Sequence, residues 1–225
     1  IDEQKNLGQF YNATGFFKPT LNQKPTLIQN QFGASFGGPV RKDKAFFFVD
    51  YEGFRRIEKA VQFATVPTMN QRSGIFSGPI QNPFTGERFM DGIVPQNQIT
   101  DFAKGVFAEL PAPNLPGTSN NLQTLPKQPT NTDKGDARYD QYFGSKLTGF
   151  ARYSHRNSII QVPASIPGLA GGNSNGDIRV ASWQLALGGT YTLSARSLIE
   201  ARVGISHTDA GKTPWFVGTE SLASK

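Results

Sequence analysis

The chain offers few side chains whose types and spacing could carry chemistry. Ser206, His207 and Asp209 lie almost side by side, and these are the residue types of a nucleophilic triad. A triad assembles in space from separate segments, whereas neighbouring residues of a strand point to opposite faces of a sheet. The motif therefore does not predict a hydrolase.

Other catalytic and metal-binding patterns are equally weak. The only other histidine is His155 and there is no cysteine, so a histidine-rich or thiolate metal site cannot form. Asp50 and Glu52 would share one strand face and could act as paired carboxylates, although lining a wet interior is the plainer interpretation. The glycine-rich stretch 168–176 has neither phosphate-loop nor dinucleotide-binding spacing. We expect no enzymatic activity, no cofactor and no metal.

The composition favours strands and turns. Among 225 residues there are 18 Phe, 6 Tyr, 24 Gly and 15 Pro, and only 37% of residues are hydrophobic, which is low for a dense globular core. No run of about 18 apolar residues exists, so a transmembrane helix is excluded. The net charge of +6 comes from scattered lysine and arginine rather than from a basic stripe, so we expect no nucleic-acid partner.

Long segments alternate between apolar and polar residues. From Arg179 to Leu193 one parity is apolar, and after a turn at residues 194–196 the alternation resumes from Ser197 to Asp209. This pattern is typical of a long β-hairpin. The predicted hairpins cover residues 30–58, 135–156 and 177–209.

The two parities of these strands divide into an apolar set and a charged set. Phe150 breaks the pattern, and Phe46 and Phe48 make the facing of the first hairpin ambiguous. We expect the apolar set to face lipid and to supply an aromatic girdle; it comprises Tyr139, Tyr153, Trp183, Leu185, Leu187, Tyr191, Ile199, Val203 and Ile205. We expect the charged set to face a wet lumen; it comprises Asp50, Glu52, Arg138, Asp140, Arg152, Glu200 and Arg202.

Two long connections separate the hairpins, at residues 59–134 and 157–176. The first is proline-rich, contains a predicted turn at residues 82–86, and contains a predicted short helix from Thr100 to Leu110 with Thr100 as its cap. Exposed loops commonly carry binding residues. The candidate ligand-binding residues are Phe76, Phe84, Arg88, Phe89, Asn173 and Asn175.

Short turns that alternate with long loops are the rule in outer-membrane barrels, where the turns are periplasmic and the loops extracellular. The predicted strands, at about 10 to 15 residues, also exceed the usual globular length and match a tilted bilayer crossing. The sequence therefore predicts an all-β fold: a partial antiparallel transmembrane β-barrel of about six long strands with one short loop helix.

Several motifs resemble the barrel of TonB-dependent outer-membrane receptors, in the Oar-like branch. The resemblance spans about Asn30 to Ser154. The motifs are Asn30-Gln31-Phe32-Gly33, Gly37-Gly38-Pro39-Val40, Lys42-Asp43-Lys44, Phe46-Phe47-Phe48, Tyr51-Glu52-Gly53, Val66-Pro67-Thr68, Arg72-Ser73-Gly74-Ile75-Phe76-Ser77, Asn82-Pro83, Thr85-Gly86, Val94-Pro95, Leu110-Pro111-Ala112-Pro113-Asn114 and Phe150-Ala151-Arg152-Tyr153-Ser154.

The resemblance implies a barrel of about 22 strands filled by a plug, located in the cell outer membrane, that takes up a large or scarce ligand with energy relayed by TonB. It also implies, in this branch, a carboxypeptidase-regulatory-like domain with a carbohydrate-binding-like fold ahead of the plug. We expect the chain to be a fragment that lacks the plug, the TonB box and the remaining strands. The implied partners are outer-membrane lipid, the TonB complex through the missing N-terminal region, and an extracellular ligand such as a siderophore, glycan or peptide.

Two other functions fit parts of the pattern. A surface adhesion or structural protein of the same barrel family would use the long loops to bind cells or matrix, without moving a solute. A soluble β-sandwich that binds carbohydrate would explain the aromatic strands but not their length.

Overall fold

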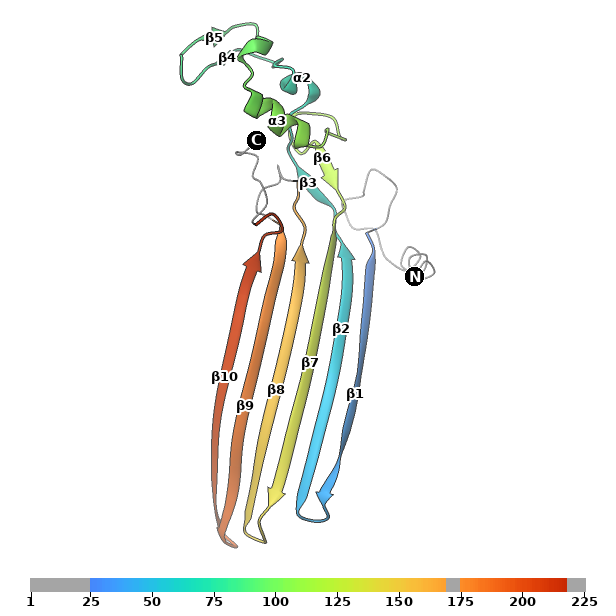
Figure 1. Ribbon diagram of the computed structural model, residues 1–225, viewed down its shortest axis with the longest axis vertical. Helices are drawn as coiled ribbons and strands as arrows, with labels where there is room; N and C mark the ends of the chain where they lie inside the picture. Colours follow the sequence, from blue (N-terminus) through green and yellow to red (C-terminus); the bar gives the residue numbers. More distant parts are fainter. Residues whose placement is uncertain (1–24, 169–174, 218–225) are drawn as a thin grey trace.

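The chain forms one long antiparallel sheet with a group of small elements at one end (Figure 1). The computed structural model describes residues 25–168 and 175–217. The strand order is β1-β2-β7-β8-β9-β10, so each strand pairs with the next long strand along the chain. The bounds of these strands are β1 Leu27–Arg41, β2 Ala45–Lys59, β7 Lys127–Tyr142, β8 Leu147–Val162, β9 Gly176–Ser194 and β10 Ser197–Thr213.

A single tight turn joins the two strands of each of the three hairpins. All three turns lie at the lower end of the sheet in Figure 1, which we call the turn end. In the first turn the amide of Lys44 donates to the carbonyl of Arg41 at 3.0 Å, and Asp43 adopts φ +60°, a left-handed conformation that aspartate tolerates better than most residues. The six predicted strands, their antiparallel pairing and their arrangement as hairpins are confirmed.

The predicted strand bounds were too short at the opposite end, which we call the loop end. β7 begins at Lys127 rather than at residue 135, and β8 continues to Val162 rather than ending at residue 156. The first loop is correspondingly shorter, at residues 60–126, and the second connection begins after Val162. Near the loop end both parities carry polar residues, such as Thr132 and Asp133 on β7, so no alternation marks these positions as a strand.

Residues 60–126 build a compact module at the loop end, which we call the loop module (Figure 1). Its elements are β3 Gln62–Ala64, α2 Met69–Arg72, β4 Ile80–Gln81, β5 Arg88–Phe89, the 3₁₀ helix η1 Gln96–Gln98, α3 Asp101–Glu109 and β6 Leu122–Thr124. The predicted short helix is confirmed as α3, and the Thr100 side chain caps it by accepting from the amide of Ala103. The helices α2 and η1 were not predicted.

The sheet is a single layer without a globular core. In the described chain the buried apolar residues are Ala45, Val66, Leu122 and Ala164. β1 and β10 form the two edges, and no further described strand pairs with them, so the sheet is open as expected for part of a barrel wall. A soluble sandwich would need a second sheet packed on one face, which the described residues do not provide.

No helix in residues 25–168 or 175–217 is long and apolar enough to cross a membrane.

Candidate functional site

The strand register sorts the charged and apolar sets onto opposite faces of the sheet. Residues opposite each other in a ladder share a face, and the face alternates at every residue. The chain of pairs that links Asp50 to Asp136, Ser154, Gln184 and Ser206 therefore defines one face, which we call the polar face. All seven residues predicted to face the lumen lie on it: Asp50, Glu52, Arg138, Asp140, Arg152, Glu200 and Arg202.

Ion pairs run across the polar face. The ammonium of Lys134 lies 2.5 Å from Glu52 on the neighbouring strand, and the guanidinium of Arg152 lies 2.6 Å from Asp136 on the strand beside it. These pairs join β2 to β7 and β7 to β8. Two more pairs lie within single strands, Arg138 with Asp140 and Arg202 with Glu200. The charges of these four pairs therefore neutralise one another while staying accessible to water.

The aromatic residues that did not fit the alternation belong to the polar face. Phe150 lies opposite Asp140 and Gly188, and its ring lies beneath the guanidinium of Arg138, 4.5 Å from the ring centroid, with Arg202 at 6.0 Å. Such contacts are favourable cation–π interactions. Phe46 and Phe48 also lie on this face, opposite Asp140 and Arg138, so the ambiguity of the first hairpin is resolved.

The opposite face, which we call the apolar face, carries all nine residues of the predicted lipid-facing set. One row across the sheet reads Val49, Ala137, Tyr153, Leu185 and Ile205. These side chains are exposed: Ile205 and Val203, for example, are 58% and 66% accessible. The full set is Tyr139, Tyr153, Trp183, Leu185, Leu187, Tyr191, Ile199, Val203 and Ile205. An exposed apolar sheet face of this extent is suited to hydrocarbon rather than to water.

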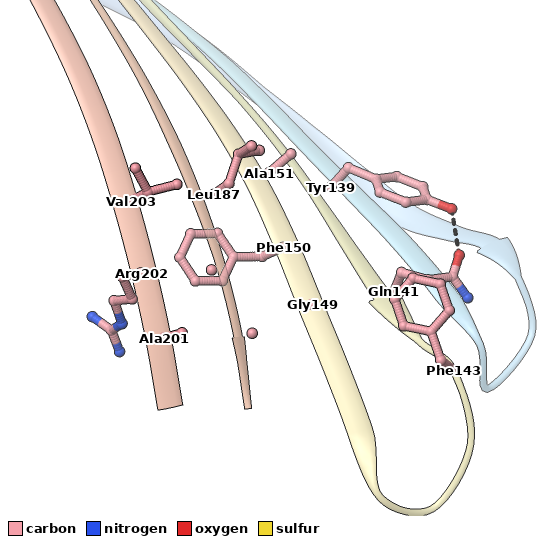
Figure 2. Close-up of a pocket in the computed structure, with 12 residues that line it drawn as sticks. Tyr139, Gln141, Phe143, Gly149, Phe150, Ala151, Leu187, Ala201, Arg202 and Val203 are labelled. Atoms are coloured by element: carbon pink, nitrogen blue, oxygen red, sulfur yellow. Dashed lines mark hydrogen bonds between the residues drawn. The ribbon is translucent and has the colours of Figure 1, made fainter. Parts of the chain in front are cut away.

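A shallow groove crosses the apolar face near the turn end (Figure 2). Gly149, Gly189 and Ala201 line it where larger side chains would fill the space, and Tyr139 and Phe143 also line it. The Tyr139 hydroxyl donates to the side-chain oxygen of Gln141 at 2.6 Å, so the hydrogen-bonding capacity of the phenol is satisfied within a largely apolar groove. An aromatic hydroxyl held in this way is typical of a membrane interface.

The two histidines of the chain flank Trp183 in a single row of the apolar face. Trp183 lies opposite His155 on β8 and opposite His207 on β10, and the rings of Trp183 and His207 are 6.0 Å apart. Sequence reasoning did not find this row, because it joins three strands. Ser206 lies opposite Gln184 on the polar face, so Ser206 and His207 point to opposite sides, as argued against a triad. In the described residues no group of three or more acidic, histidine or cysteine side chains could hold a metal.

Three of the six candidate ligand-binding residues lie in one small hairpin of the loop module. Arg88 and Phe89 form β5 and pair with Gln81 and Ile80 of β4, and Phe84 lies in the turn between these strands with 96% of its surface exposed. The predicted turn at residues 82–86 is confirmed, since the Asn82 side chain accepts from the amides of Phe84 and Thr85. An asparagine side chain that binds the backbone ahead of it fixes a turn locally.

The other loop candidates lie elsewhere. The amide of Phe76 donates to the carbonyl of Gly92 at 2.9 Å, which places Phe76 beside the return segment of the loop module. Asn175 precedes β9 and is only 2% exposed, so its side chain does not face an external ligand. Asn173 lies outside the described residues.

Polar side chains hold the loop module together. The Arg72 guanidinium donates to the carbonyls of Phe107 at 3.0 Å and Leu110 at 2.9 Å, and also to that of Pro111. The carbonyls at the C-terminal end of α3 lack partners within that helix, and Arg72, at the end of α2, supplies donors to them. The fully buried Asn121 accepts from the Val66 amide at 2.9 Å and donates to the Val66 carbonyl at 2.8 Å. The module is therefore an ordered structure that presents Phe84.

Six long strands with one apolar and one charged face, short turns at one end and an ordered loop module at the other define a segment of a membrane barrel wall. Residues 7–225 match the family described as outer membrane beta barrel domain, and the chain belongs to that family and to the outer membrane. No curated protein and no solved structure matches the chain.

Proposed function

We propose that the chain forms part of the wall and of the outward loops of a receptor that takes up a large or scarce ligand across the outer membrane, using energy relayed by TonB. The observation that carries the proposal is the ordered loop module, which presents the almost fully exposed Phe84 on a turn held by Asn82. A rigid exposed aromatic binds a ligand at a low cost in conformational entropy.

The polar face supports a role as the inner wall of the barrel. Its cross-strand pairs, such as Lys134 with Glu52 and Arg152 with Asp136, keep the surface wet without a large net charge. The apolar face would then meet lipid. We further propose that the loop module is extracellular and that the short turns are periplasmic, as is the rule for barrels of this kind.

The TonB step rests on the resemblance of the motifs in the first hairpin and the loop module to TonB-dependent receptors of the Oar-like branch. The proposed partners are outer-membrane lipid around the apolar face, the TonB complex through an N-terminal region like that of TonB-dependent receptors, and an extracellular siderophore, glycan or peptide. We propose no catalytic activity and no nucleic-acid partner.

An adhesion or structural protein of the same barrel family is the second candidate. Phe84 again favours it, because an exposed aromatic at a rigid tip can anchor a protein or glycan of another surface without any transport. This candidate requires neither TonB nor a path along the polar face.

Uptake by intact cells separates the two candidates. Cells that carry the complete barrel protein would be given a panel of fluorescent siderophores, oligosaccharides and peptides, with and without TonB. Transport predicts that one probe accumulates and that its accumulation falls to background without TonB. Attachment of cells to a surface that persists without TonB, with no probe accumulating, would instead establish the adhesive function.

A variant of the loop tip adds a second test. Phe84→Ala is expected to reduce probe accumulation severalfold at an unchanged amount of protein in the membrane, because the exposed ring makes no contact that stabilises the fold. Lys42→Ala, in a turn at the other end of the sheet, is the matched control and is expected to leave accumulation unchanged.

A further inference from the structure

One arginine of the polar face stands apart from the ion pairs. In the described chain Arg56, Lys134, Arg138, Arg152 and Arg202 each lie within a salt bridge to a carboxylate. Arg156, on β8, is exposed and has neither a salt bridge nor a hydrogen bond to any described residue. The unpaired carboxylate of this face, Asp50, lies on β2, and β7 separates it from Arg156.

Because of its position, Arg156 without a counter-ion destabilises the sheet. It lies directly opposite Lys134 in the β7–β8 ladder, and like charges directly opposite each other destabilise a sheet. Lys134 is neutralised by Glu52 at 2.5 Å, whereas nothing in the described residues neutralises Arg156. An anion bound beside Arg156 would remove this repulsion.

The surface around Arg156 is hollowed and hydroxyl-rich. A hollow of about 480 Å³ spans β7 to β10. Its polar-face lining residues are Lys134, Asp136, Arg152, Ser154, Arg156, Ser182, Gln184, Ser206 and Thr208. The side chains of Ser182, Gln184, Ser206 and Thr208 make no hydrogen bond to another described residue and so are free to bind a ligand.

The charges within the hollow leave a positive excess at Arg156. Asp136 is the one carboxylate that lines it, and its oxygen accepts from both Arg152 and Ser154. Glu52 neutralises Lys134 from outside the lining. Arg156 therefore remains as the one cation of the hollow without a counter-ion among the described residues.

We propose that this hollow, the Arg156 site, binds an oxyanion, either a carboxylate or a phosphate group of a ligand that reaches the polar face. The guanidinium can offer two parallel N–H groups to such an anion, and the surrounding hydroxyl and amide groups can bind its remaining oxygens. The site requires that the polar face around Arg156, which lies nearer the loop end than the turn end of β8, is open to solvent rather than covered by a plug. It goes beyond the proposed function, because it holds whether the protein takes up a ligand or adheres to a surface.

Binding of simple anions to the complete barrel protein tests the site. The protein would be purified in a neutral maltoside detergent and titrated calorimetrically with citrate as the carboxylate probe and with inorganic phosphate, at constant ionic strength set with chloride. At least one probe is expected to bind and to raise the temperature of unfolding, because a ligand that binds the folded state stabilises it. Binding of only one probe would identify the source of the oxyanion, and binding of neither would overturn the proposal.

The variant Arg156→Gln is expected to weaken the binding by about tenfold or more, since hydrogen bonds to charged groups are among the strongest. The matched control is Arg179→Gln, which removes an arginine without a salt bridge among the described residues from the apolar face of β9 and is expected to leave the affinity unchanged. Equal affinity of Arg156→Gln and the unaltered protein would overturn the proposal.

Unfolding without added anion separates binding from a structural role. Loss of Arg156 removes the repulsion from Lys134, so Arg156→Gln is expected to unfold at the same or a higher temperature, and a clearly lower temperature would instead assign Arg156 to the fold and overturn the site. If Arg156→Gln does not fold, Arg156→Lys keeps the charge but loses the planar fork. It is expected to weaken binding severalfold, and unchanged binding would again count against the site.

Discussion

The sheet and the loop module reach order by different means. In the sheet every long strand is held along its whole length by a ladder of backbone hydrogen bonds to its neighbours, and the alternation of side chains sets the register. The loop module has only two-residue and three-residue strands. Its order comes from a few side chains that bind backbone groups far away in the sequence.

Two asparagines show most clearly how side chains that bind backbone groups order the loop module. Asn121 binds both the amide and the carbonyl of Val66. Asn114 does the same with Gln123, at 2.7 Å to its amide and 2.8 Å to its carbonyl. Each asparagine side chain thus makes the two hydrogen bonds that a residue of a neighbouring strand would otherwise make. A single substitution should therefore destabilise the loop module more than the sheet, because many backbone hydrogen bonds stabilise each strand of the sheet.

The largest effect is expected for Asn121→Ala. It would leave the buried amide and carbonyl of Val66 without partners, and each orphaned group costs about 1–3 kcal/mol. Hydrogen exchange read by mass spectrometry should show lost protection across residues 60–126 and unchanged protection in β7 to β10. Asn97→Ala is the control, since Asn97 is exposed and makes no hydrogen bond to a described residue. Equal loss of protection in the sheet would show that the two regions are not independent.

The sheet has its own sensitive position at Gly188. A Cβ at this position would overlap the ring of Phe150, so Gly188→Ala should displace the ring from Arg138 and destabilise the barrel by about 1–3 kcal/mol, as overpacking does. The measurement is the temperature at which the complete protein loses its heat-modifiable mobility on a denaturing gel.

Gly204→Ala is the control for Gly188, because a Cβ there would lie 3.6 Å from the Leu185 carbonyl, an ordinary contact. Replacing Phe150 with leucine in the Gly188→Ala background should recover part of the loss, since the two positions share one contact. A loss in Gly204→Ala equal to that in Gly188→Ala would refute the role of the Phe150 ring.

The sheet could be predicted from the sequence wherever apolar and polar residues alternate along the strands. The nine apolar and seven charged residues were assigned to opposite faces by parity alone, and the register places them so. Alternation fails at Phe150, because an aromatic ring that packs on a glycine between arginines is stable on the polar face. It also fails near the loop end, where polar residues occupy both faces of the strands, and the predicted strand bounds were too short there.

The loop module could be predicted only where its signals are local. The cap at Thr100 and the Asn82 turn lie within a few residues of the groups that they bind. The hydrogen bonds of Arg72 and Asn121 join residues that are 35 and 55 positions apart in the chain. No pattern in a single sequence predicts such distant pairs. The hollow around Arg156 was missed for the same reason, because four strands contribute to it.

The smallest effect is expected for a change at Thr100, the helix cap that was predicted from the sequence. Thr100→Ala removes the hydrogen bond that the Thr100 side chain accepts from the Ala103 amide, and the loss of such a cap costs about 1 kcal/mol. Thr100→Ser should restore the cap. Because Arg72 binds the carbonyls of Phe107 and Leu110 at the other end of α3, faster hydrogen exchange should stay within the first turn of the helix. Exchange that spreads through Glu109 would mean that the cap, rather than the distant arginine, holds the helix in the loop module.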